Sequence, residues 1–260
     1  GIIQMRNACG LLALACRQAR RKLLVIDLAA VAAVASEPSL RAAYLLEFAQ
    51  PFSYATPLRD HGKSAVPPES FVGRIREVSS ILDPNGSSVV YGARRNGKTA
   101  VLLHVADKYH APADGFIATA VSVQGCGRFE GGKVADLWPR IAEAMPDVFR
   151  PRQVIATPEA FEDGIKRFLA GNPNARILLM LDEADDVIEA DAQADFGAFL
   201  TLQNLMEASG RRFKVVFAGL RNVSRLVLEG NAPLRQIASN PIRIGPFAGD
   251  ELKYAEIMLR

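Results

Sequence analysis

Cysteine and histidine are scarce in this chain, which contains only three of each among its 260 residues. The cysteines form no C-x-x-C pair, so neither a disulfide framework nor a structural zinc site is supported. The histidines are equally scattered, which disfavours a catalytic or metal-binding histidine cluster. We therefore expect a reducing, cytoplasmic location. The residues concerned are Cys9, Cys16, Cys126, His61, His104 and His110.

A membrane-spanning segment and a strong charge imbalance are also missing. Residues 17–36 imitate a secretory signal, because a basic cluster precedes an apolar stretch, but the stretch is shorter than the roughly 20 residues that span a bilayer. Asp27 interrupts it, and we interpret it as a buried strand followed by a helix. We expect no membrane association. The net charge of +3 is too small to indicate a nucleic-acid partner by itself, so that partner stays open.

One glycine-containing stretch matches the phosphate-binding pattern G-x-x-x-x-G-K-[ST], known as Walker A. Residues 88–91 before it predict a short buried strand. Residues 98–109 after it predict a helix with Val101, Leu102 and Val105 on one face. The stretch and the residue after it are Gly92, Ala93, Arg94, Arg95, Asn96, Gly97, Lys98, Thr99 and Ala100.

A strand, a glycine-rich turn and a helix form the geometry that phosphate binding needs. Successive backbone N–H groups and the helix N-terminus attract an anion, and Gly92 and Gly97 permit the close backbone approach. Lys98 would reach the β- and γ-phosphates, and the Thr99 hydroxyl would bind Mg²⁺. We therefore expect ATP and Mg²⁺ as ligands, with residues 92–100 lining the phosphates.

A second motif lies far downstream, where residues 176–181 form an apolar run that ends in Asp182 and Glu183. A hydrophobic strand followed by two acids, after a phosphate loop, is the Walker B arrangement. Asp182 would hold Mg²⁺ beside Thr99, and Glu183 would act as general base on the attacking water. The alternative is a merely acidic surface turn, because Asp185, Asp186 and Glu189 follow closely.

Predicted strands and helices alternate along the rest of the chain. Strands are expected at 116–123, 176–182, 213–218 and 241–245, and helices at 134–145, 157–171 and 191–209. This alternation predicts an α/β fold with three layers and a parallel central sheet. Ligands of such sheets bind at the carboxyl ends of the strands, where both motifs fall.

The composition divides the chain into four parts. We expect a partial N-terminal element at 1–50, a linker at 51–68, an ATPase core at 69–246 and the start of a truncated C-terminal lid at 247–260. The first residue is not Met and the sequence stops inside a predicted helix, so a piece of a longer protein is expected. Without its lid, such a site would be open to water and would bind weakly and turn over slowly.

Three segments together resemble the AAA+/STAND branch of P-loop ATPases, in particular prokaryotic STAND and initiator-type AAA+ proteins. They are Phe-Val-Gly-Arg at 71–74, the Gly-Ala-Arg-Arg-Asn-Gly-Lys-Thr loop and the Leu-Leu-Met-Leu-Asp-Glu-Ala run, and the resemblance spans residues 68–246. It implies that Val72 and Gly73 line the adenine and that Arg74 braces this segment or the phosphates. For Arg74 and Glu77, an ordinary helix start is the alternative.

The resemblance also implies a polar sensor residue after the strand at 213–218. Arg221 would stabilise charge on the γ-phosphate, and Asn222 is the second candidate. The commonest AAA+ pattern has Asn or Thr directly at the strand end, and this sequence departs from it. Arg235 is a candidate arginine finger toward a neighbouring subunit, or else a surface arginine. The implied catalytic set is Glu183, Lys98 and Arg221.

The function that these features imply is a slow ATPase, converting ATP and water to ADP and phosphate, in which the nucleotide state controls domain arrangement or assembly. Homo-oligomerisation through the ATPase core is a further expectation. The alternatives are an AAA+ motor or DNA-loading ATPase, a nucleotide-binding scaffold without turnover, and a small-molecule kinase.

Overall fold

The computed structural model describes most of the second and third quarters of the chain. The described residues are 36, 66, 71–86, 88–126, 129–130, 133–134, 136–149, 155–219, 241–249 and 251–253. The expected N-terminal element at 1–50 and the linker at 51–68 lie almost wholly outside them. The chain divides into two compact units: Lys63–Ala65 with Arg74–Pro246 form the larger, and Gly1–Gly62, Val66–Gly73 and Phe247–Arg260 form the smaller.

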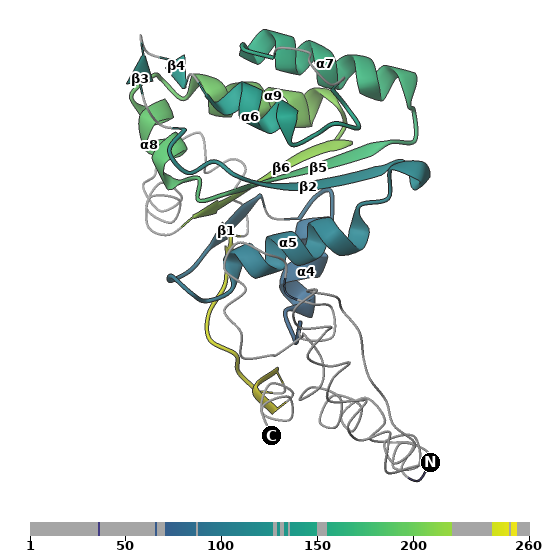
Figure 1. Cartoon of the computed structure of the whole chain (residues 1–260), viewed down its shortest axis with the longest axis vertical. Helices are drawn as coiled ribbons and strands as arrows, with labels where there is room; N and C mark the ends of the chain where they lie inside the picture. The colour runs from purple at the N-terminus through teal and green to yellow at the C-terminus, as the bar shows by residue number, and fades with distance from the viewer. Residues whose placement is uncertain are drawn as a thin grey trace, which may run out of the picture. The chain divides into compact units, whose positions relative to one another are not determined.

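The larger unit contains a five-stranded sheet with the strand order β2-β5-β6-β1-β7, and every pairing within it is parallel (Figure 1). The predicted parallel α/β sheet is therefore confirmed. Two strands far apart in sequence, β1 and β5, are separated only by β6. The bounds are β1 (Val89–Tyr91), β2 (Phe116–Ser122), β5 (Arg176–Asp182), β6 (Phe213–Gly219) and β7 (Ile242–Arg243).

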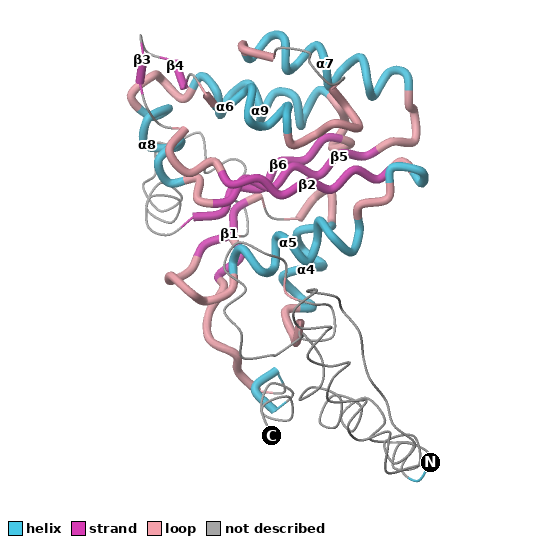
Figure 2. The backbone as a smooth tube through the Cα atoms, viewed as in Figure 1, coloured by secondary structure: helices cyan, strands magenta, loops and turns pink. Residues whose placement is uncertain are grey.

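Helices cover both faces of this sheet, so the larger unit has three layers. Figures 1 and 2 show α4 (Ile75–Leu82) and α5 (Lys98–Tyr109) on one face, and α6 (Leu137–Glu143), α7 (Pro158–Gly171) and α9 (Gly197–Ala208) on the other. Shorter elements complete it: the 3₁₀ turn η4 (Pro112–Asp114), the antiparallel pair β3 (Phe129–Glu130) and β4 (Lys133–Val134), and α8 (Asp185–Ala192). Of the described helices, none combines the length and apolar character that crossing a bilayer requires.

The apolar content of the strands explains why the sheet forms. All seven residues of β6 are buried, as are the last six of β5, because a parallel sheet covered on both faces shields its strands from water. Under α6 and α7, the Phe161 ring lies 5.3 Å from the rings of Trp138 and Phe149 and 6.3 Å from that of Phe213. This aromatic cluster fixes the helical layer against β6.

Two helices begin and end where the sequence predicts. The residues of α5 are 98–109, as expected, and Val101, Leu102 and Val105 are buried. Thr157 caps α7, because its hydroxyl accepts a hydrogen bond of 3.2 Å from the Ala160 N–H, and Pro158 occupies the first helical position.

The single helix expected at 191–209 is wrong, because the structure has two helices, α8 and α9. The helix is interrupted before Gly197, where Asp195 and Phe196 have left-handed φ angles of 54° and 56°. The buried Asp191 carboxylate accepts hydrogen bonds from the N–H groups of Ala198 (3.0 Å) and Phe199 (2.7 Å) and so caps α9. Burial raises the pKa of Asp191, and these two backbone donors act in the opposite direction.

The helix expected at 134–145 also begins later than predicted, at Leu137, and ends at Glu143. A proline at position 139 predicts a disturbance of this helix, but the structure shows the helix uninterrupted there. This proline occupies the first turn of α6, where the backbone N–H groups have no partner within the helix, so that its missing N–H costs nothing.

A buried lysine joins β6 to the end of α4. Lys214 is only 3% exposed, and its ammonium donates to the carbonyl oxygens of Ser80 (3.1 Å), Ile81 (2.9 Å) and Asp83 (2.6 Å). These carbonyls lie at the helix C-terminus, where the helix itself offers no donors. Burial lowers the pKa of Lys214 to about 8, and the Asp83 carboxylate partly counteracts it.

This lowered pKa predicts a stability that increases with pH. The pKa of Lys214 is about 8 in the folded chain against 10.5 for an ordinary lysine, so the unfolded chain binds more protons between these pH values. The free energy of unfolding should rise across this window by up to about 3 kcal/mol, since one pKa unit corresponds to about 1.4 kcal/mol. Urea denaturation at several pH values measures it. In Lys214→Arg the side chain stays charged, and this contribution should vanish; parallel pH profiles of the two proteins would contradict the prediction.

Candidate functional site

The two motifs predicted separately meet at the carboxyl edge of the sheet. The Thr99 hydroxyl, in the first turn of α5, donates a hydrogen bond of 2.6 Å to Oδ2 of Asp182 at the end of β5, across 83 residues of sequence. Asp182 is only 6% exposed, and its Oδ1 accepts a 3.0 Å hydrogen bond from the Glu183 N–H. One buried carboxylate is thus aimed at the start of the helix that follows the glycine loop.

Left-handed backbone shapes the 92–99 loop. Gly97 has a φ of 88° and directly precedes α5, and Arg95 has a φ of 65°. A Cβ atom added at Gly97 would have no neighbour within 4 Å, so this part of the loop surface is open. No side chain caps α5 and its first turn contains no acid. The amide groups there remain available to an anion.

Lys98 folds back over this loop. Its side chain is largely buried, and its ammonium donates to the carbonyl oxygens of Gly92 (2.9 Å) and Ala93 (3.0 Å). Burial lowers the pKa of Lys98, whereas the nearby carboxylates of Asp182, Asp185 and Glu183 raise it. A phosphate group would be a stronger acceptor for this ammonium than a neutral carbonyl.

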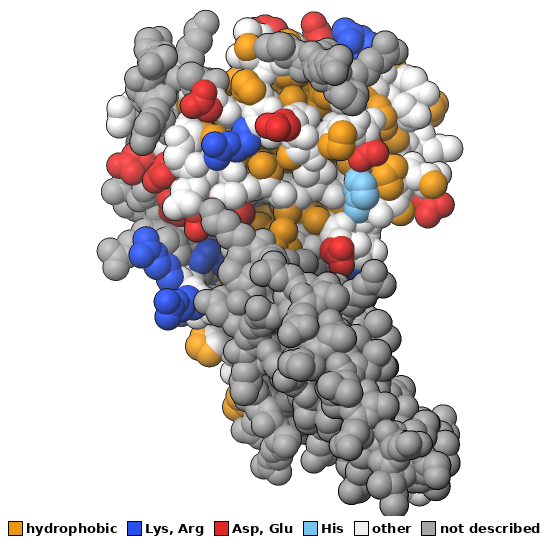
Figure 3. All heavy atoms as spheres, viewed as in Figure 1, with side chains coloured by type: hydrophobic (Ala, Val, Ile, Leu, Met, Phe, Trp, Pro, Cys, Tyr) orange, Lys and Arg blue, Asp and Glu red, His pale blue; other side chains and the backbone are white. Residues whose placement is uncertain are grey.

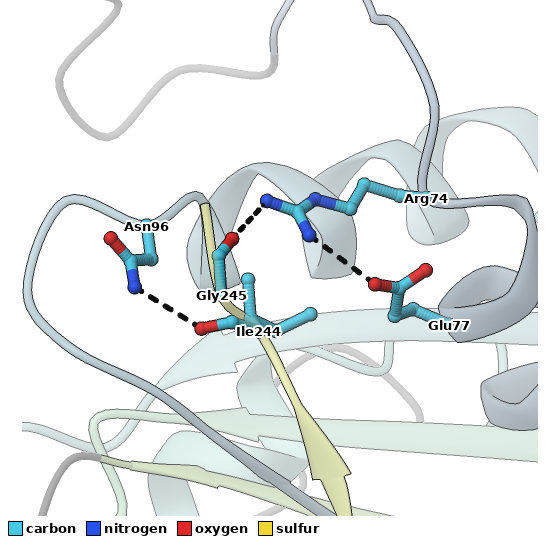
Figure 4. Close-up of polar contacts among 5 residues, drawn as sticks. All are labelled: Arg74, Glu77, Asn96, Ile244 and Gly245. Atoms are coloured by element: carbon cyan, nitrogen blue, oxygen red, sulfur yellow. Dashed lines mark hydrogen bonds and ion pairs between the residues drawn. The ribbon is translucent and has the colours of Figure 1, made fainter. Parts of the chain in front are cut away.

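The residue that follows β7 contacts the loop (Figure 4). The Asn96 side-chain amide donates a 3.2 Å hydrogen bond to the carbonyl oxygen of Ile244. A Cβ atom at Gly92 would lie 2.3 Å from the same oxygen, a distance that no side chain tolerates. The first glycine of the motif is therefore required by the neighbouring Ile244 carbonyl as well as by the expected ligand.

Arg74 is nearly buried, at 6% exposure, and it also contacts the end of β7 (Figure 4). Its guanidinium donates to the carbonyl oxygen of Gly245 at 2.5 Å and to the Glu77 carboxylate at 3.3 Å. With a φ of 59°, Arg74 is a further left-handed residue. Its guanidinium thus braces the start of α4 against the strand end.

Glu183 is exposed and follows Asp182 with a left-handed φ of 55°. An L-residue in this conformation is disfavoured by about 1–2 kcal/mol. The Ala184 N–H donates a 2.9 Å hydrogen bond to the Ala218 carbonyl of β6, which anchors the chain just after this turn. The turn therefore keeps a carboxylate at the surface next to the buried Asp182, and strained backbone of this kind is enriched at functional sites.

Charged side chains surround this edge. Arg94 and Arg95 of the loop are both exposed, and Asp185 and Asp186 begin α8. Figure 3 shows basic side chains gathered along one edge of the described surface, with acidic ones close by.

The remaining predicted residues are not all brought to the loop. Ala100 is half-buried in the first turn of α5. Val72 and Gly73 are half-buried in the smaller unit, where a Cβ on Gly73 would lie 2.9 Å from Oε1 of Glu251. The predictions for Arg221, Asn222 and Arg235 fall outside the described residues.

The residues at this edge fit a hydrated Mg²⁺ ion. No group of three or more His, Cys, Asp or Glu side chains among the described residues could hold a metal. Thr99 and Asp182 instead offer a hydroxyl and a carboxylate at 2.6 Å from each other. Mg²⁺ bound to nucleotide keeps several waters and takes few protein ligands, so such a pair suffices.

Two backbone groups at this site have no signature in the sequence. The carbonyl oxygens of Ile244 and Gly245 accept from Asn96 and Arg74, respectively. Every residue carries a carbonyl, so no residue type marks these acceptors. Only the parallel pairing of β1 with β7, in which Tyr91 lies opposite Arg243, brings them to the loop.

No protein-family model matches this chain, and no curated protein matches it.

Gly97 and Gly171 both have room for a side chain but differ in backbone conformation, so replacing each of them tests the loop geometry. A Cβ at Gly97 or at Gly171 meets nothing within 4 Å, but only Gly97 is left-handed. We expect Gly97→Ala to lower the free energy of unfolding by about 1–2 kcal/mol, and Gly171→Ala to leave it unchanged or raise it by about 0.4–1 kcal/mol. Denaturant unfolding of both variants measures these changes. Equal effects would show that the left-handed turn at 97 is not needed.

Proposed function

We propose that this chain binds ATP with Mg²⁺ and hydrolyses it slowly, as a molecular switch of the AAA+/STAND type. The observation that carries the proposal is the 2.6 Å hydrogen bond between Thr99 and Asp182. It joins the end of a phosphate-loop pattern to the acid at the end of β5. A turn that is acidic only by chance would not be expected to direct a buried carboxylate at this particular hydroxyl.

In this proposal, residues 92–100 cradle the phosphates of ATP with their backbone N–H groups. The Lys98 ammonium exchanges its two carbonyl acceptors for oxygens of the β- and γ-phosphates. Thr99 and Asp182 hold the cation, and Mg²⁺ when bound neutralises charge on the phosphates during transfer. Arg94 and Arg95 add positive charge at the loop surface.

Glu183 is the proposed general base for hydrolysis. Its exposed carboxylate accepts a proton from the attacking water, whose oxygen forms a bond to the γ-phosphorus while the bond to the ADP oxygen breaks. Asp182 is buried and is proposed to hold the cation, so the exposed Glu183 beside it is the better placed of the two acids to act on the water.

The switch part of the proposal follows from the resemblance and from the division into two units. Nucleotide in the larger unit would change how the smaller unit is arranged or assembled, and hydrolysis in the cytoplasm would reset it. The alternatives differ in turnover. Fast turnover that DNA stimulates would indicate a motor or DNA-loading ATPase, and binding without turnover would indicate a scaffold.

Replacing Lys98 tests nucleotide binding. We expect Lys98→Ala to weaken the affinity for ATP–Mg²⁺ by about 10- to 100-fold, because a hydrogen bond to a charged group contributes about 1.5–3 kcal/mol. Isothermal titration calorimetry on the whole chain measures it. Lys108→Ala, at an exposed position in the last turn of the same helix, is the control and should bind like the parent. An unchanged affinity in Lys98→Ala would remove the central claim.

Replacing Glu183 separates binding from hydrolysis. We expect Glu183→Gln to slow phosphate release by about 10²- to 10⁴-fold, because the amide has the shape of the acid but cannot take the proton. ATP affinity should change little, since the carboxylate is proposed to act on the water. Asp186→Asn, at an exposed acid in the first turn of α8, is the matched control. A Glu183→Gln enzyme with the parent rate would exclude Glu183 as the base.

A further inference from the structure

We propose that Asn96 and Arg74 are positioning residues that transmit the state of the phosphate loop to the end of β7, and through it to the segment that begins at Phe247. This inference rests on the proposed nucleotide binding, and it identifies the residues through which that binding would act on the smaller unit. Neither residue needs to touch the nucleotide for this role.

The first step lies at Ile244, which is fully buried. Its N–H donates a 2.7 Å hydrogen bond to the Tyr91 carbonyl, just before the loop. Its carbonyl accepts from the Asn96 amide, inside the loop, and is in close contact with the Gly92 backbone. Both backbone polar groups of Ile244 are therefore held, the N–H by the last residue of β1 and the carbonyl by Asn96 within the loop; Figure 4 shows the second of these contacts.

The second step lies one residue further on. The Gly245 carbonyl is held by the Arg74 guanidinium, which the Glu77 carboxylate orients. Because Arg74 is nearly buried and paired on two sides, it has little freedom to move alone. If Ile244 and Gly245 are displaced, either Arg74 moves with them or its hydrogen bond to the Gly245 carbonyl breaks.

These contacts lie next to points where the chain passes between the two units. The chain passes between the two units on both sides of Lys63–Ala65, and then at Gly73–Arg74 and at Pro246–Phe247; the last two passages adjoin these contacts. Within the larger unit, Arg74 binds Gly245, so the residues at these two passages are tied to each other. Within the smaller unit, Gly73 packs closely against the Glu251 side chain. A change at the loop thus reaches both passages through two hydrogen bonds.

Phosphate binding would change the hydrogen bonds within the loop. Lys98 donates to the Gly92 and Ala93 carbonyls, and a phosphate would compete for this ammonium. Gly92 would lose that donor while it remains against the Ile244 carbonyl. A loop ordered around phosphates would then hold Asn96, and with it the strand end, in a single arrangement.

The experiment is hydrogen–deuterium exchange on the whole chain, with and without saturating ATP–Mg²⁺, followed in peptides that cover residues 247–253. In the parent we expect nucleotide to slow exchange there by about two- to tenfold, the effect of one net hydrogen bond. In Asn96→Ala and in Arg74→Met, each saturated according to its own measured affinity, the nucleotide-dependent difference should be lost.

The controls separate this inference from a structural effect and from the proposed function. Arg76→Met, at an exposed arginine of α4, should keep the parent's nucleotide-dependent difference. Arg74→Lys keeps the positive charge but loses the planar guanidinium that donates to two acceptors at once, and it should lose most of the nucleotide-dependent difference in exchange. If Arg74→Met does not fold, Asn96→Ala decides alone. A parent that binds ATP without slowed exchange, or variants that keep the full difference, would overturn the inference but not nucleotide binding; a parent that does not bind ATP would overturn both.

Discussion

The hydrogen bond from the Thr99 hydroxyl to the Asp182 carboxylate depends on the order of the strands. Parallel strands direct all their carboxyl ends to one edge, and only β6 separates β1, which leads into the loop, from β5, which ends in Asp182. Burial then matters for the chemistry. Asp182 is 6% exposed, so water screens it little, and a carboxylate there interacts with a cation more strongly than one at the surface. The sheet thus brings the site residues together, and the sheet itself forms because its strands are apolar enough to be buried on both faces.

The sequence predicted those parts of the structure that depend on local patterns. Continuous apolar runs marked β5 and β6, and Thr157 with Pro158 marked the start of α7, because burial and capping leave their requirements in residue types. The break between α8 and α9 was missed. It depends on the Asp191 carboxylate reaching the N–H groups of Ala198 and Phe199, an interaction whose signal is one acid among several. For the site, the loop and the acids could be predicted, whereas the Arg74 and Asn96 contacts could not, because their acceptors are backbone carbonyls of the two residues that follow β7.

Several strained residues gather around this edge, and the sheet explains how the fold tolerates them. Arg74, Arg95 and Glu183 all have left-handed φ angles, each disfavoured by about 1–2 kcal/mol relative to ordinary backbone. Each is held by a fixed anchor. Arg74 donates to the Gly245 carbonyl, Arg95 lies three residues before the start of α5, and Glu183 directly precedes the hydrogen bond from Ala184 to Ala218. Such anchors hold conformations that the isolated peptide would avoid, and rigid surroundings are what a site needs to hold charges in place.

The hydrogen bonds that Lys98 makes within its own loop bear on the slow ATPase that we propose. Its ammonium is already satisfied by the Gly92 and Ala93 carbonyls, so a phosphate gains only the difference between a charged and a neutral acceptor. Its buried position also lowers the pKa of Lys98, and an incoming phosphate must offset the cost of keeping that charge. Both effects reduce the net affinity that the lysine can contribute. At the same time Lys98 has two alternative sets of partners, the two carbonyls and a phosphate, whose difference in strength is reduced by these effects. A protein whose output depends on switching between two states needs such a small difference, because a ligand can shift an equilibrium only by as much as its differential affinity for the two states.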